Sequence, residues 1–171
     1  GDTATLERTW AVDGGRLVLA DSMVGEVAGS MLPVNMLVRR ISIQGRPIQI
    51  RVKLAPRFGY DRRPARRIRR HQGTLIIDPG DLSLAVTSDA PGLLAPDRPT
   101  IMEVTPGGPV TVVMSAAYRR PLFLVPPSVA AEEAGRDETR WQRWADTLIT
   151  GPHHRRILVR SLITLKLLTY S

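Results

Sequence analysis

The segment 47-PIQIRVKL-54 has the pattern that decides the fold of this chain. Ile48, Ile50 and Val52 alternate with polar residues, which is typical of a β-strand with one face on a core and the other in water. The same alternation recurs in short segments between residues 5 and 125. These segments are residues 16–20, 35–43, 74–77, 82–87, 101–104 and 110–116. The chain is therefore expected to be mainly β.

Turn signals rich in glycine and proline separate these segments at hairpin distance. Three of the turns are residues 44–47, 78–81 and 105–109, and we expect each to join two strands that pair with one another. Short strands at regular spacing with such turns are typical of antiparallel sheets packed face to face. The sequence therefore predicts a two-sheet antiparallel β-sandwich over residues 1–125.

A helical connector is predicted for residues 126–152, after Pro126-Pro127. Ser128 is a candidate N-cap, Gly135 is expected to break or bend the helix, and Asp137 offers a second helix start. Trp141 and Trp144 then share one helical face. A tryptophan pair can stack on a sugar ring, but at this spacing we favour packing in the core or at an interface with another domain or a partner.

The terminal segment, residues 153–171, is predicted to be a helix that is apolar on nearly every side. It is shorter than the roughly 20 apolar residues of a membrane span, and Arg160 and Lys166 interrupt it, so we expect no membrane insertion. Such a helix needs cover on several sides. The predicted interface residues on it are Leu162, Leu165 and Leu168.

The composition fits one globular domain of 171 residues with a largely aliphatic core. No cysteine is present, which excludes disulfides and thiolate metal sites and is consistent with a cytoplasmic protein. The formal net charge is +8, and of 24 basic residues only Lys53 and Lys166 are lysines. We interpret this arginine excess as a compositional bias rather than as selection for an anionic ligand.

Arginines concentrate in one segment between the expected strands. This basic patch comprises Arg62, Arg63, Arg66, Arg67, Arg69 and Arg70. Together with Tyr60 or Phe58 it could bind phosphates and stack on a base. It matches no helix-turn-helix, RNA-recognition or zinc-finger signature, so a solvated arginine-rich hairpin loop is the preferred interpretation and nucleic acid is not expected as a partner.

No catalytic or metal-binding constellation is recognisable in the sequence. Acidic residues fall in expected turns or on helix faces expected to be solvated, such as Glu133 and Glu138, so no pair of carboxylates across a cleft is indicated. His153 and His154 are adjacent and would diverge on a helix, which makes a poor chelate. We expect no catalytic residue, cofactor or metal in this chain.

The terminal helix also carries a family resemblance. Residues 158–170, LVRSLITLKLLTY, closely resemble the first helix of the catalytic α/α barrel in bacterial glucoamylase- and trehalase-like enzymes of glycoside hydrolase family 15. Weaker similarities upstream occur in the family's order. VRRI (38–41), LAPRFGY (54–60) and LAVTSDAPG (84–92) resemble its N-terminal β-domain, and residues 139–158 resemble its connector helix. The order Arg57-Phe58-Gly59-Tyr60-Asp61 departs from the family's arginine-phenylalanine-aspartate-tyrosine-glycine.

The resemblance implies the non-catalytic N-terminal region of a family 15 glycosidase. Its parent would hydrolyse α-glucosidic bonds in glucans or trehalose by inversion. Neither family catalytic glutamate has a counterpart here, so this chain alone is expected to be inactive. The implied partner is a catalytic α/α barrel that the chain lacks, or another copy of the chain, with a glucan or disaccharide as ligand. The alternatives are an arginine-rich nucleic-acid-binding module and a stand-alone carbohydrate-binding or assembly β-domain.

Overall fold

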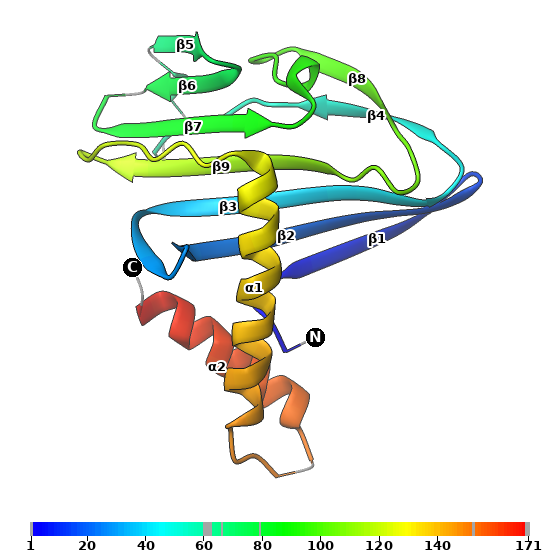
Figure 1. The fold of residues 1–171 in the computed structure, drawn as a ribbon, viewed down its shortest axis with the longest axis vertical. Helices are drawn as coiled ribbons and strands as arrows, with labels where there is room; N and C mark the ends of the chain where they lie inside the picture. The colour runs from blue at the N-terminus through cyan, green and yellow to red at the C-terminus, as the bar shows by residue number, and fades with distance from the viewer. Residues whose placement is uncertain (1, 60–62, 66, 79, 152, 170–171) are drawn as a thin grey trace.

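The computed structural model describes residues 2–59, 63–65, 67–78, 80–151 and 153–169. A seven-stranded antiparallel sheet has the order β1-β2-β3-β9-β7-β6-β5, and β4 pairs with β8 in a second, two-stranded sheet (Figure 1). This mainly β, two-sheet arrangement confirms the predicted fold class. The strands are β1 (Leu6–Val12), β2 (Gly15–Val27), β3 (Ser30–Gly45), β4 (Ile48–Lys53), β5 (Arg67–His71), β6 (Thr74–Asp78), β7 (Leu82–Ser88), β8 (Pro99–Val104) and β9 (Val110–Tyr118).

The two sheets pack face to face because the strands alternate in polarity. Val110 and Val112 of β9 join the core between the sheets, where Ile48, Ile50 and Val52 of β4 contact them. Val113, on the opposite face of the same strand, belongs to a separate cluster. Strand β9 is therefore covered on both sides and forms the centre of the domain.

A close approach of backbones fixes the end of the β1–β2–β3 meander. Gly15 is paired with Gly45, and a Cβ at Gly45 would collide with the Gly14 carbonyl oxygen. The Arg46 N–H donates to that same oxygen at 3.0 Å. Gly14 and Gly45 also have φ of +78° and +123°, a region that only glycine adopts at little cost.

Two of the predicted strand pairings are wrong. Residues 44–47 were expected to pair β3 with β4, and residues 105–109 to pair β8 with β9, yet β4 pairs with β8 while β3 pairs with β9. At both turns the chain leaves one sheet for the other. The third predicted hairpin, β6 with β7, is correct. A turn sequence signals a change of direction, and it does not determine whether the strand returns alongside its neighbour or in the opposite layer.

The helices differ from the sequence-based prediction in two respects. Helix α1 (Pro127–Asp146) is continuous. It does not break at Gly135, and no second helix starts at Asp137. The N-cap is Pro126, with no side-chain capping hydrogen bond, rather than Ser128. Helix α2 (Arg155–Thr169) follows, and a short 3-10 helix, η1 (Pro91–Leu93), lies beside β8. One glycine in a long helix lowers helix stability by only about 1 kcal/mol. The packing of the α1 residues before and after Gly135 outweighs this loss.

Helix α1 lies across the face of the large sheet opposite β4 and β8, over β9, β3 and β2 (Figure 1). Its C-terminal half extends past the sheet edge, where α2 packs against it. We refer to this C-terminal half of α1 together with α2 as the helical arm. The arm contains both the two tryptophans and the predicted leucine interface.

Candidate functional site

The first half of α1 is attached to the sheet by small side chains. Ala130 and Ala134 are fully buried and pack against Val24, Val38 and Val113. Alanine at these positions lets the helix backbone approach the strands closely, and a larger side chain would push them apart. This half of α1 is therefore a fixed base from which the arm projects.

A buried carboxylate reinforces the attachment. Glu133 is only 2% exposed, and its Oε1 accepts hydrogen bonds from the Ala28 backbone N–H at 3.1 Å and from Arg136 at 2.6 Å. Ala28 lies in the β2–β3 turn with a φ of +51°. Glu133 thus ties this turn to α1. The expectation that Glu133 is solvated is wrong, because it lies between Ala130 and Ala134 on the stripe that faces the sheet.

Glu138 forms a second polar link one turn further along α1. Its Oε1 accepts hydrogen bonds from Thr5 and Arg40, both at 2.9 Å, and Thr5 also bonds to Ser22. The carboxylate therefore joins α1 to β2, β3 and the segment before β1. Glu138 is only partly exposed, and its role is structural rather than that of a solvated surface charge.

Asp137 lies on the adjacent side of α1 in a less favourable setting. Burial raises the pKa of its carboxyl group, while hydrogen bonds from Arg140 and Trp141 and the charge of Arg140 oppose this shift. The nearby Glu26 carboxylate adds a smaller upward contribution to the pKa. Arg140 also approaches Glu26 at 3.7 Å and so bridges two acidic groups.

The two tryptophans pack inside the arm. Trp141 is 8% exposed, and its ring meets that of Trp144 edge to face at a centroid distance of 5.4 Å. The Lys166 ammonium of α2 lies 4.4 Å from the Trp144 ring centroid and 5.7 Å from that of Trp141. These rings pack against α2 of the same chain, and Trp141 is too buried to stack on a sugar.

Arginine hydrogen bonds fix α2 relative to the rest of the arm. Arg155 donates to the Ala145 carbonyl at 3.2 Å and to the Thr150 hydroxyl at 3.0 Å. Arg160 donates to the Thr3 carbonyl at 2.7 Å, next to Ala4, which packs against the same cluster. The arm is thus anchored at both of its helices and at the start of the chain.

Helix α2 has two apolar faces, and only one is covered. Val159 and Ile163 are buried against α1, with Leu167 partly buried beside them. On the opposite face, apolar side chains point to solvent, and Leu162 lies half-buried at its border. The exposed members, which we call the outer face of α2, are Ile157 (64% exposed), Leu158 (45%), Leu165 (59%) and Leu168 (68%). The predicted interface residues Leu165 and Leu168 are thus on this open surface.

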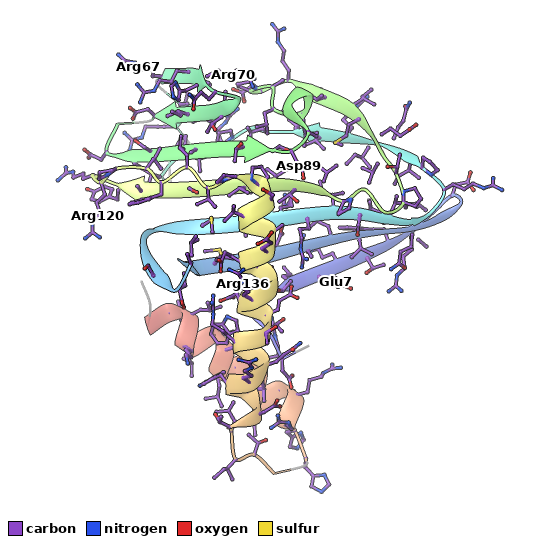
Figure 2. All side chains as sticks on the ribbon, viewed as in Figure 1. Glu7, Arg67, Arg70, Asp89, Arg120 and Arg136 are labelled. Atoms are coloured by element: carbon purple, nitrogen blue, oxygen red, sulfur yellow. The ribbon has the colours of Figure 1, made fainter. Side chains whose placement is uncertain are left out.

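The described members of the basic patch do not form one surface. Arg62 and Arg66 lie outside the described residues, and Arg63 is held by two backbone hydrogen bonds with Phe58. Arg67, Arg69 and Arg70 belong to β5, an exposed edge strand rather than the expected loop (Figure 2). Strand alternation places Arg70 on the opposite face from Arg67 and Arg69, and Arg70 donates to the Leu94 carbonyl at 2.6 Å.

No cluster of histidine, aspartate or glutamate suited to a metal ion occurs among the described residues. A surface cavity of about 600 Å³ lies between Phe58 and Tyr118. Among the described residues that line it, the one carboxylate is Asp81, which accepts two hydrogen bonds of 3.2 Å from Arg119. His153 and His154 are both exposed. Within the described part of the chain, no helix is long and apolar enough to cross a membrane.

Comparison with models of known protein families, with curated proteins and with solved structures found no match for this chain. The fold and the site define it as a β-sandwich domain bearing a helical arm. The sequence analysis did not predict the polar links of Glu133 and Glu138. For Glu133 a signal was available, because it lies on the same helical stripe as Ala130 and Ala134, which are buried.

Proposed function

We propose that this chain is the non-catalytic N-terminal region of a glucoamylase- or trehalase-like glycosidase, and that the outer face of α2 docks against the helices of the catalytic domain. The observation that carries the proposal is the outer face itself. Ile157, Leu158, Leu165 and Leu168 project from a helix whose other face is already packed. Several large exposed apolar side chains on one helix face mark an interaction site.

A helical partner suits this surface better than a sheet or an extended peptide. Ile157 and Leu165 lie on one i, i+4 row of α2 with the exposed Ser161 between them, and Leu168 follows three residues later; rows of this kind pack into the grooves of neighbouring helices. An element that is apolar on two faces is typical of a helix in the interior of a helical array. The α/α barrel implied by the sequence resemblance is an array of this type.

The β-sandwich would then serve as the platform for the arm. The attachments at Glu133, Glu138 and Arg160 hold the arm in one direction relative to the sheet. A rigid arm lowers the entropic cost of docking because its orientation is set before binding. The chemistry of the parent enzyme would reside in the docked domain, and this chain would support it.

A binding titration tests the proposal. The chain would be titrated by calorimetry with the catalytic α/α barrel of a bacterial family 15 enzyme produced without its own N-terminal region. We expect binding to the wild-type chain and loss of binding by the double variant Leu165→Asp/Leu168→Asp. Both positions are exposed, so the variant should melt like the wild type. Gln142→Asp, on an exposed position of the same arm, is the matched control and should bind normally.

Glucose release from trehalose and maltooligosaccharides is the second test. The chain alone should release no glucose above a protein-free blank. Turnover by the purified chain would contradict a non-catalytic role, and equal binding of the barrel by wild type and double variant would contradict docking through α2.

A further inference from the structure

The face of the large sheet opposite α1 is covered over only part of its width. Strands β4 and β8 pack over Ile41, Val86 and Val112, towards the middle of the sheet. On β1 and β2 the same face carries Leu6, Trp10 and Met23 at 43%, 44% and 41% exposure. The open floor consists of these three residues and the half-buried Leu19 and Leu37.

Strand register shows that the open floor continues the core between the sheets. Leu19 is paired with the buried Ile41, and Met23 is paired with Leu37. Directly opposed residues of an antiparallel pair lie on one face of a sheet. The floor is therefore part of the apolar surface that β4 and β8 cover elsewhere, and it extends past the area that these two strands cover.

Two of the three charged side chains on this face of β1, β2 and β3 neutralise each other, and the third, Arg8, is exposed and paired in register with Leu19. Arg39 donates to both carboxylate oxygens of Asp21, at 2.7 and 2.8 Å, across the β2–β3 pair. The opposite charges of such a bidentate pair cancel, so the pair has little net charge with which to attract an incoming ion. The floor thus suits apolar side chains, and Arg8 beside Leu19 adds a positive charge that favours an acidic neighbour.

Strand β4 has an unpaired edge beside the floor. It pairs with β8 along its whole length, and no other strand in the described part of the chain pairs with it. Figure 1 shows β4 on the side of β8 nearer to β3, β2 and β1. Neighbouring strands lie about 4.8 Å apart, so a strand added to this edge would extend the small sheet over the floor.

The side chains of β4 indicate what that strand would be. Ile48, Ile50 and Val52 point to the core, whereas Arg51 and Lys53 are exposed on the outer face and form no ion pair among the described residues. Two copies of β4 pairing with each other would bring these cations together, which is unfavourable. An acidic neighbour would be favourable for the same reason.

We infer that the β4 edge and the open floor bind an extended peptide segment of another protein, in which apolar residues alternate with acidic ones. Its backbone would pair with β4, its apolar side chains would cover Leu19 and Leu37, and its carboxylates would lie beside Arg51 and Lys53. Strand addition of this kind gains affinity from main-chain hydrogen bonds and specificity from alternate side chains. The inference does not depend on docking through α2.

Calorimetry with two end-capped synthetic peptides of about seven residues, a typical strand length, tests the inference. One alternates glutamate with valine, and the other alternates lysine with valine. The wild-type chain should bind the glutamate peptide at least about tenfold more tightly than the lysine peptide, and Arg51→Glu/Lys53→Glu should reverse this preference. Amide hydrogen exchange in Ile48–Lys53 should slow when the glutamate peptide is bound.

Arg16→Glu is the matched control, because Arg16 is an exposed cation on the opposite face of β2 and should not alter binding. Leu37→Asn should weaken binding, with a melting curve to verify folding. Failure of the wild type to bind the glutamate peptide, or equal binding of both peptides by the charge-reversed variant, would overturn the inference. Self-association through β4 would also overturn it, by assigning the edge to a second copy of the chain.

Discussion

The two halves of α1 share one continuous helix and differ in what they pack against. The first half places Ala130 and Ala134 on a broad sheet, where small side chains suffice because many strand residues surround them. The second half keeps only polar links to the sheet, through Glu138 and Arg140, and its Trp141 and Trp144 pack against α2 and Ala4. A large aromatic side chain can fill one interface with one helix, but it cannot cover the far side of that helix. The exposed outer face of α2 follows from this difference.

Removing the aromatic core of the arm should have the largest effect. Trp141→Ala deletes a buried ring from a cluster with few other members, and we expect it to destabilise the arm by about 3–5 kcal/mol. Urea unfolding followed by far-ultraviolet circular dichroism measures this. Trp10→Ala, at a tryptophan on β1 that is 44% exposed, is the control and should cost less. Equal losses would contradict the view that Trp141 holds the arm together.

Enlarging a small residue tests the other half of the helix. Ala134→Leu should push α1 away from Val24 and Val38 and cost about 1–3 kcal/mol in unfolding free energy. Glu132→Leu, at a well-exposed position in the same turn, should change stability by no more than about 0.5 kcal/mol. Thermal melts of both variants provide the comparison, and a tolerated Ala134→Leu would show that the contact is loose.

A substitution at the junction between the two halves of α1 should raise the stability of the protein rather than lower it. A Cβ at Gly135 would meet no atom within 4 Å, and the residue lies in the helix interior. Gly135→Ala should therefore raise the unfolding free energy by roughly 0.5–1 kcal/mol. A loss of stability would mean that α1 bends at this residue, as the sequence alone had suggested.

The smallest effect is expected at Asp137, and it depends on pH. Because burial raises its pKa in the folded state, ionisation of this carboxyl opposes folding above its unfolded pKa of about 3.9 and has no such cost below it. Asp137→Asn should therefore raise the melting temperature at neutral pH, and the gain should shrink towards about pH 3. Asp146→Asn, at an exposed aspartate of the same helix, should show no comparable dependence. A gain that persists unchanged in acid would contradict the burial argument.

The sequence pattern predicts the strands better than it predicts their partners. Alternation in residues 47–54 correctly indicates β4, because one buried face is a local property. The pairing of β4 with β8, and of β3 with β9, depends on which layer each strand enters, and no local signal encodes that choice. Strand β5 was missed for a related reason. Its arginines resemble a loop, yet pairing with β6 fixes them in a strand.

The candidate site was predictable in part. The helical spacing of Leu162, Leu165 and Leu168 indicated an apolar helix, and the structure places Leu165 and Leu168 on its open face. Helical periodicity alone could not show which side α1 would cover, because the sequence is apolar around most of the helix. That choice depends on Trp141 and Ala145, which reach Val159 and Ile163 only in the folded arm.

Hydrogen exchange in the presence of the family 15 catalytic barrel tests the central claim most directly. The outer face of α2 and the sheet-bound half of α1 can be compared within one sample. We predict that adding the barrel slows amide exchange along α2, including Leu158, Leu165 and Leu168, and leaves Ala130 and Ala134 unchanged. Unchanged exchange in α2 at saturating barrel, or slowing confined to the β-sandwich, would contradict the claim that α2 is the docking element.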